Sequence, residues 1–274
     1  MKPEWLKVQI PSGENYKELM GLIHNNNIHT ICESAKCPNI AECFSKRTAT
    51  FLILGDICTR NCLYCNVTHG KPEKVDPFES KKIAEAVRKM GLKYVVITSV
   101  TRDDLADGGA ITFIRTIKEI RKLSPDLKVE LLTPDFRDQI KNILEVNPDV
   151  FGHNIETVKR LFPKVRSQSD YIRSLVFLRQ IKEYNPRQLT KSGIMVGLGE
   201  SKEEIIETLE DLKKAKVDII TIGQYLQPRV DLAEVKKYYT PEEFKEFETI
   251  GKNMGFKIFS APLVRSSYHA DELV

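Results

Sequence analysis

The sequence predicts an α/β fold, a partial (β/α)6 barrel of the TIM type with an N-terminal extension and a short C-terminal tail. Two observations predict it. Short, almost entirely apolar runs recur along most of the chain, as expected of parallel strands buried on both faces. Amphipathic stretches with helical spacing lie between them, and each strand and helix together occupy about 30 residues. Right-handed crossovers wind such units into a barrel, and about six units fit in this chain.

Each apolar run is interpreted as one strand. The expected strands are residues 48–54, 94–100, 129–133, 150–155, 193–198, 219–225 and 257–263. The expected organisation is an N-terminal extension at 1–47, the barrel at 48–264 and a tail at 265–274.

Helix boundaries are also readable between the apolar runs. Ser201 with Glu204, and Thr240 with Glu243, have the spacing of capping boxes, and Pro241 suits a first helical position. Gly255 marks a helix end. In the N-terminal extension, residues 15–24 carry apolar positions at the spacing of a short amphipathic helix.

The composition excludes several classes of protein. The 42 basic and 38 acidic residues are spread along the chain, and the net charge of +4 is too small to indicate nucleic-acid binding. No stretch approaches the roughly 20 apolar residues of a membrane span, and the first residues lack an apolar signal core. We therefore expect a cytoplasmic protein that binds neither membrane nor nucleic acid.

Three cysteines follow the first expected strand in the order C-x-x-x-C-x-x-C: Cys58, Cys62 and Cys65. Three thiolates on one short loop suit three irons of a 4Fe-4S cluster and leave the fourth iron open for chemistry. A structural zinc site is the alternative, but such sites usually have a closed set of four ligands. The loop also sits at the carboxyl end of a strand, where barrel enzymes carry their active sites.

A second group of three cysteines precedes this loop: Cys32, Cys37 and Cys43. All six cysteines of the chain lie between Cys32 and Cys65, and metal ligation is favoured over disulfides because nothing indicates export. The two groups together predict two clusters, with three separate structural cysteines as the alternative for the second group.

Other loops at the same end of the strands carry polar side chains. Residues 98–110 offer hydroxyls, beginning with Thr98 and Ser99, and three carboxylates, of which Asp107 is equally well explained as a helix cap. Asn154 and Glu156 follow the fourth strand and suit hydrogen bonds to a ribose.

The fifth strand, with its sequence G-I-M-V-G-L-G-E, is rich in glycine. Gly193 and Gly197 would allow the backbone to approach a flat ligand closely.

These motifs carry a resemblance to a known family. The cysteine loop with Tyr64 is similar to the C-x-x-x-C-x-(aromatic)-C loop of the radical S-adenosylmethionine (SAM) superfamily. The segment from Gly193 to Glu200 is similar to its adenine-contacting G-x-I-x-G-x-x-E pattern, with Met195 at the isoleucine position. Both cysteine groups, the T-S-V-T-R-D-D-L-A-D-G-G loop, P-D-F, H-N-I-E-T, G-Q-Y-L-Q-P and the terminal R-S-S-Y occur in the order of the lipoyl synthase family. The resemblance covers residues from about 32 to 270.

The resemblance implies an enzyme that inserts sulfur at C6 and C8 of an octanoyl chain attached to a lysine of a carrier protein. Cys58, Cys62 and Cys65 would hold the 4Fe-4S cluster that binds SAM and cleaves it to a 5′-deoxyadenosyl radical. Such a radical is needed because an alkyl C–H bond has no acid–base handle. Cys32, Cys37 and Cys43, with Ser267 as the fourth ligand, would hold an auxiliary 4Fe-4S cluster that donates the sulfur.

The same resemblance implies the partners and leaves two alternatives. The partners would be an octanoylated lipoyl-carrier protein or domain and a low-potential electron donor such as ferredoxin or flavodoxin. Another radical SAM sulfur-inserting enzyme is one alternative, although it is not expected to combine the N-terminal cysteines with R-S-S-Y. A non-enzymatic iron-sulfur or zinc protein is the other.

Overall fold

The computed structural model describes residues 3–8, 13–46, 48–136 and 138–273. Its strands follow one another as β1-β2-β5-β6-β7-β8-β9-β10 through the main sheet. The chain divides into two compact units. Residues 8–60 and 66–150 form what we call the N-terminal unit, and residues 1–7, 61–65 and 151–274 form the C-terminal unit.

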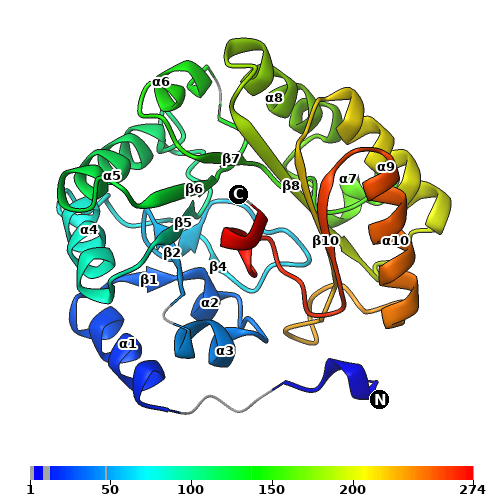
Figure 1. The fold of residues 1–274 in the computed structure, drawn as a ribbon, viewed down its shortest axis with the longest axis horizontal. Helices are drawn as coiled ribbons and strands as arrows, with labels where there is room; N and C mark the ends of the chain where they lie inside the picture. The colour runs from blue at the N-terminus through cyan, green and yellow to red at the C-terminus, as the bar shows by residue number, and fades with distance from the viewer. Residues whose placement is uncertain (1–2, 9–12, 47, 137, 274) are drawn as a thin grey trace. The chain divides into compact units, whose positions relative to one another are not determined.

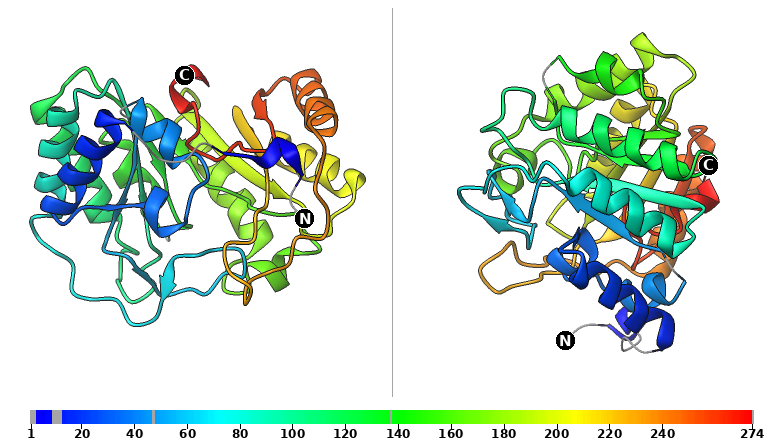
Figure 2. Two further views of the ribbon diagram at one scale, coloured as in Figure 1. Left: turned by 90° about the horizontal axis from the view of Figure 1, so that it is seen from below. Right: turned by 90° about the vertical axis from the view of Figure 1, so that its left-hand side faces the viewer.

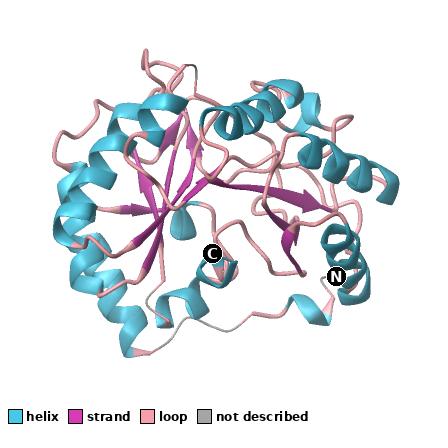
Figure 3. Ribbon diagram, turned by 45° about the horizontal axis from the view of Figure 1, so that its top comes forward, coloured by secondary structure: helices cyan, strands magenta, loops and turns pink. Residues whose placement is uncertain are grey.

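In the N-terminal unit, strands β2, β5 and β6 alternate with helices and pair with one another in parallel. Strand β1 joins β2 antiparallel, and β3 and β4 form a separate small pair. Helices α4 and α5 pack side by side (Figure 1), and the helices lie outside the strands (Figure 3). The elements are α1 Glu14–Asn25, β1 His29–Thr30, α2 Ile31–Ser34, α3 Ile40–Ser45, β2 Thr50–Ile53, β3 Ile57–Cys58, β4 Thr68–His69, α4 Glu79–Met90, β5 Tyr94–Ser99, α5 Ala110–Leu123, β6 Lys128–Leu132 and α6 Ile140–Leu144.

The N-terminal helices of this unit form a small layer of their own. Helices α1 and α3 lie side by side (Figure 2), with the Tyr16 and Phe44 rings 5.7 Å apart. Thr30 caps α2 by accepting a hydrogen bond from the Glu33 amide. The predicted helix at 15–24 is therefore confirmed, and it supports the segment that carries the first three cysteines.

In the C-terminal unit, β8, β9 and β10 are parallel neighbours. Their helices pack over a core of aliphatic and aromatic side chains that includes Ile194, Ile222, Phe244 and Phe247. The elements are η1 Glu4–Leu6, β7 Val150–Gly152 (which begins at the border of the unit), α7 Phe162–Val165, α8 Tyr171–Tyr184, β8 Leu189–Val196, α9 Lys202–Lys214, β9 Ile219–Gln224, α10 Pro241–Asn253, β10 Lys257–Ser260 and η2 Ala270–Leu273.

The predicted fold class is confirmed. Each expected strand is present, and six strand-helix units precede β10 in the part of the chain that the structure describes. Both predicted capping boxes, at Ser201 and Thr240, are formed. The expected domain boundary at residue 47 lies outside the described residues, so the division into extension, barrel and tail stays a prediction. Within the described part of the chain, no helix is long and apolar enough to cross a membrane.

Several strand ends differ from the prediction, by three or four residues in β7, β8 and β10. Strand β10 ends at Ser260 rather than residue 263. Strand β7 stops at Gly152 rather than residue 155, because Glu156 has a φ of 69° and pairs with Ile194 only through an isolated bridge. Strand β8 begins at Leu189 rather than 193. Its first residues, Thr190, Lys191 and Ser192, are polar and nevertheless almost fully buried, so the apolar pattern missed them.

Candidate active site

The first three cysteines lie in the helical segment of the N-terminal unit. Cys32 is in α2, Cys43 is in α3, and the Cys37 amide donates to the Cys32 carbonyl oxygen at 2.9 Å. The side chain of Asn66, just after the second cysteine group, donates to the Ser34 carbonyl oxygen at 2.8 Å. The chain that leaves the second cysteine group is thereby tied to the helix that carries Cys32.

The thiols of this first group fit an iron-sulfur cluster. Burial, followed by the charge of Cys37, raises the pKa of Cys32 and that of Cys43 to about 12, so the three sulfurs lie within one another's electrostatic field. Such thiols ionise when cationic iron compensates the charge. Among the described residues, no three His, Cys, Asp or Glu side chains converge on one metal ion. A cubane cluster does not require such convergence, since each cysteine binds a different iron.

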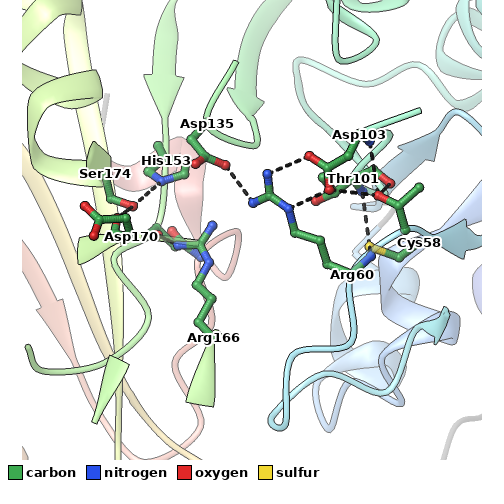
Figure 4. Close-up of polar contacts among 11 residues, drawn as sticks. Cys58, Arg60, Thr101, Asp103, Asp135, His153, Arg166, Asp170 and Ser174 are labelled. Atoms are coloured by element: carbon green, nitrogen blue, oxygen red, sulfur yellow. Dashed lines mark hydrogen bonds and ion pairs between the residues drawn. The ribbon is translucent and has the colours of Figure 1, made fainter. Parts of the chain in front are cut away.

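Cys58 ends β3 in the N-terminal unit and already has polar partners at its sulfur. The backbone N–H groups of Arg60 and Thr101 donate to Cys58 Sγ at 3.4 and 3.3 Å (Figure 4). Amide donors to a thiolate are a usual feature of iron-sulfur sites and influence the reduction potential. Cys58 therefore suits the ligand role that the sequence predicts.

Arg60 is the residue that the sequence reasoning missed. Its guanidinium group donates to both carboxylate oxygens of Asp103 and to Asp135 Oδ1, each at 2.8 Å (Figure 4). Asp103 follows β5 and Asp135 follows β6, so the arginine joins the cysteine loop to two strand ends. The sequence did contain a signal for these contacts, since an arginine lies inside the cysteine loop and an aspartate follows each of the neighbouring strands β5 and β6.

The remaining carboxylates of the loop between β5 and α5 form contacts within that loop and at the start of α5. Asp104 pairs with the buried Arg102 at 2.9 Å. Asp107 accepts hydrogen bonds from the Gly109 and Ile111 amides at the start of α5, which confirms the capping interpretation. Thr98 Oγ1 donates to the Leu132 carbonyl oxygen at 2.8 Å, whereas Ser99 Oγ is buried and has no partner among the described residues.

Cys62, Tyr64 and Cys65 belong to the C-terminal unit. The Cys65 amide donates to the Cys62 carbonyl oxygen, which forms a tight turn around Tyr64. The backbone of Leu63 donates to the Val165 carbonyl oxygen at 2.9 Å and accepts from the Ala233 amide at 2.8 Å. These bonds anchor the second half of the cysteine loop to two segments of its own unit.

Tyr64, Asn154 and Glu156 form a polar cluster in the C-terminal unit. Burial raises the pKa of Glu156, whereas Arg166 and hydrogen bonds from Asn154 and Tyr64 act against this rise. Burial and the charge of Glu156 raise the pKa of Tyr64, so its hydroxyl stays protonated at neutral pH. The cluster brings together three of the residues that the sequence predicts at SAM.

Residues next to this cluster hold its backbone. Arg166 donates to the Asn154 carbonyl oxygen at 2.8 Å. His153 is fully buried and lies 3.1 Å from Ser174 Oγ, which donates to the Asp170 carbonyl oxygen (Figure 4). His153 therefore joins the end of β7 to the start of α8, while Asn154 remains partly exposed.

Gly193 lies against the Asn154 side chain. A Cβ atom at this position would lie 2.9 Å from Asn154 Oδ1 and 3.0 Å from Thr221 Oγ1. A side chain at this position would therefore crowd the ends of the Asn154 and Thr221 side chains, so glycine leaves room for Asn154 beside β8.

Glu200 and Gly197 shape the turn after β8. The Glu200 carboxylate accepts hydrogen bonds from the Gly197 amide at 2.5 Å and the Leu198 amide at 2.9 Å. Gly197 has a φ of +109°, and a Cβ atom there would lie 2.1 Å from Gln224 Nε2. In this structure Glu200 holds the loop, and its predicted contact with SAM stays a prediction.

The terminal R-S-S-Y segment is well anchored within the C-terminal unit. The Tyr268 ring stacks on Phe259 with an interplanar angle of 2°. The Val264 carbonyl oxygen approaches Gly223 so closely that a Cβ atom there would lie only 2.0 Å away. Ser266 Oγ donates to Asn154 Oδ1 at 3.0 Å. Ser267, the predicted cluster ligand, is partly exposed next to this bond.

Comparisons with known proteins agree with these features. Residues 52–223 match the model of the radical SAM superfamily, and residues 1–37 match the N-terminal domain of lipoyl synthase of the radical SAM family. Solved structures share the fold at low sequence identity. HydG, a maturase of the [FeFe]-hydrogenase, aligns with a TM-score of 0.62 at 14% identity over 89% of this chain and 63% of its own. Methylornithine synthase aligns with a TM-score of 0.56 at 13% identity over 89% of this chain and 81% of its own.

Curated relatives match at much higher identity. The lipoyl synthase of Caldanaerobacter subterraneus subsp. tengcongensis is 54% identical over 98% of this chain and 96% of its own length. That of Rubrobacter xylanophilus is 53% identical over 99% of this chain and 86% of its own. Since both the radical SAM model and these relatives span most of the residues described above, the chain belongs to the lipoyl synthase family of the radical SAM superfamily.

Proposed function

We propose that this chain inserts two sulfur atoms, at C6 and C8, into an octanoyl group carried on a lysine of a lipoyl-carrier protein or domain. The observation that carries the proposal is the 54% identity to a lipoyl synthase over nearly the whole chain. It is supported by the presence of both cysteine groups and the terminal R-S-S-Y segment in one chain.

The cofactors are two 4Fe-4S clusters and SAM. We assign one cluster to each group of cysteines. Cys58, Cys62 and Cys65 would hold the cluster that binds SAM, and Cys32, Cys37 and Cys43 would hold the auxiliary cluster. When bound, these groups supply a carbon-centred radical and sulfur, which acid–base side chains cannot provide for an unactivated alkyl chain.

The C-terminal unit supplies most of the residues that we assign to SAM. Tyr64, Asn154 and Glu156 form one polar cluster there, and Glu156 and Asn154 offer hydrogen-bonding groups for a ribose. Gly193 and Gly197 lack side chains where backbone and ligand would meet, and Glu200 supports their loop. Thr98 and Ser99, at the end of β5, complete the assigned set, and the buried, unpartnered hydroxyl of Ser99 is consistent with a ligand contact.

Ser267 is assigned as the fourth ligand of the auxiliary cluster. A hard alkoxide suits a soft iron-sulfur site less well than a thiolate, so its bond is the easier one to release. Ser267→Cys is therefore expected to slow sulfur transfer and the consumption of the auxiliary cluster. Unchanged turnover and unchanged cluster consumption would remove this assignment.

The partners and the compartment follow from the same chemistry. The reaction requires an octanoylated carrier as substrate and a low-potential electron donor such as ferredoxin or flavodoxin. Six cysteines without a disulfide among them suit a reducing environment. We therefore assign the protein to the cytoplasm.

The test is an anaerobic reaction of the reconstituted protein with SAM, a strong reductant and an octanoyl-lysine peptide, followed by mass spectrometry. Gain of two sulfur atoms and formation of 5′-deoxyadenosine are expected, with loss of one cluster. Formation of 5′-deoxyadenosine without sulfur gain would favour another radical SAM sulfur-inserting enzyme. Absence of both products would favour a non-enzymatic iron-sulfur protein.

A further inference from the structure

Arg60 acts on the Cys58 sulfur through its backbone. Its amide donates to Cys58 Sγ at 3.4 Å, and the Thr101 amide donates to the same sulfur at 3.3 Å. The two donors belong to different segments, the cysteine loop and the loop after β5, so their alignment on one sulfur depends on contacts that join these segments.

The Arg60 side chain supplies that connection. It is 8% exposed and binds both oxygens of Asp103, in the loop that also contains Thr101. Thr59 reinforces the same joint, since its amide donates to the Thr101 carbonyl oxygen at 3.0 Å and its hydroxyl accepts from the Asp103 amide at 3.1 Å. Rotation of either loop would therefore break several bonds at once.

Asp135 adds a buried and less replaceable contact. Its side chain is 1% exposed and accepts from Arg60 Nη1 at 2.8 Å. Removing the arginine would take a charged hydrogen-bond donor away from a buried carboxylate, which is unfavourable. A planar guanidinium reaches Asp103 and Asp135 together, whereas a lysine ammonium lacks the fork needed for the bidentate contact.

We infer that Arg60 is a positioning residue that keeps two N–H donors on the Cys58 sulfur and so sets the reduction potential of the cluster held by Cys58, Cys62 and Cys65. This inference rests on the proposed function. Amide donors withdraw negative charge from a ligand sulfur, and the arginine charge acts in the same direction. Both favour the reduced cluster, so loss of Arg60 shifts the midpoint potential to a more negative value.

The experiment compares the wild type with Arg60→Gln and Arg60→Lys as reconstituted holoenzymes. The measured quantities are iron content, the electron paramagnetic resonance spectrum and the midpoint potential of the cluster whose spectrum changes on addition of SAM. Arg60→Gln is expected to have a more negative potential and about 10–100-fold lower turnover, as is typical when a residue that supports a metal ligand is lost. Arg60→Lys keeps the charge and should have an intermediate potential.

Arg102→Lys is the matched control. Arg102 is also buried in the β5 to α5 loop, but its guanidinium binds Asp104 and the carbonyl oxygens of Leu54 and Glu73. This substitution is expected to lower the melting temperature and to leave the potential of the SAM-responsive cluster unchanged.

The outcomes separate this inference from the proposed function. Absence of a SAM-responsive cluster in the wild type would contradict the proposed function itself. A SAM-responsive cluster with the same potential in the wild type and both Arg60 variants would overturn only the inference. Loss of cooperative thermal unfolding in both variants would assign Arg60 a purely structural role and would overturn it as well.

Discussion

Ser266 Oγ donates a hydrogen bond to Asn154 Oδ1 at 3.0 Å, and the two residues are 112 positions apart in the chain. Ser266 precedes Ser267, which we assign to the auxiliary cluster, and Asn154 belongs to the polar cluster that we assign to SAM. The terminal segment therefore orients a side chain of the proposed SAM site within the same unit.

Ser266→Ala is expected to weaken SAM binding about fivefold, because a hydrogen bond of this kind contributes about 1 kcal/mol and the Asn154 amide loses its orientation. Isothermal titration of the reconstituted protein with SAM measures the effect. Thr249→Ala is the control, since it removes an exposed hydroxyl on α10 of the same unit and should leave SAM affinity unchanged. Equal losses of affinity in both variants would show that the hydrogen bond to Asn154 is not the cause.

Gly193→Ala is expected to destabilise the protein by about 1–3 kcal/mol and to weaken SAM binding, because the added methyl group displaces Asn154 and Thr221. Urea unfolding and SAM titration measure the two effects. Gly21→Ala is the control, since that helical glycine has open space around it and alanine should be neutral or slightly stabilising. If Gly193→Ala has the stability and the SAM affinity of the wild type, the position of Asn154 is not important for either property.

Glu200→Ala is expected to lower the free energy of unfolding by about 1–3 kcal/mol, because the buried Gly197 and Leu198 amides lose their acceptor. Glu210→Ala, on the exposed face of α9, should change it by no more than about 0.5 kcal/mol. Chemical denaturation without SAM provides the measurement. If Glu200→Ala retains its stability but binds SAM weakly, the carboxylate acts on the ligand rather than on the loop.

Ionisation of Asp149 is expected to make the free energy of unfolding decrease at acidic pH. Burial raises its pKa, but hydrogen bonds from Lys128, the Val129 amide and Arg121 outweigh burial and hold the pKa below the ordinary 3.8. The ionised form is thus favoured in the folded state, so its stabilising effect is complete above pH 3.8 and disappears as the pH falls through the lower, folded-state value.

Asp149→Asn tests this pH dependence. At pH 7 this substitution should lower the free energy of unfolding by about 2 kcal/mol, which is typical for hydrogen bonds to a charged group. The difference in free energy of unfolding between the variant and the wild type should become smaller when urea unfolding is repeated below pH 3.8. Asp126→Asn, at an exposed turn, is the control and should have little effect at either pH. A constant difference at all pH values would mean that ionisation of Asp149 is not its cause.

Much of the fold was predictable because its signals are local. The apolar runs located all of the expected strands, and the capping boxes at Ser201 and Thr240 located two helix starts, since each involves residues only three positions apart. Spacing alone also identified both cysteine groups. The start of β8 was missed for the opposite reason, since Thr190, Lys191 and Ser192 are buried through tertiary contacts that a local apolar pattern does not record.

The sequence by itself therefore determined the fold class and the order of strands and helices, and it is the basis for the cysteines that we propose as ligands of two clusters. Only the tertiary structure decided that Arg60 binds Asp135, that Ser266 orients Asn154 and that Glu200 holds its own loop. The first two pairs are separated by 75 and 112 positions. Such contacts arise when strand order brings distant loops to the same edge, and the partner of a long polar side chain then depends on geometry that no local pattern contains.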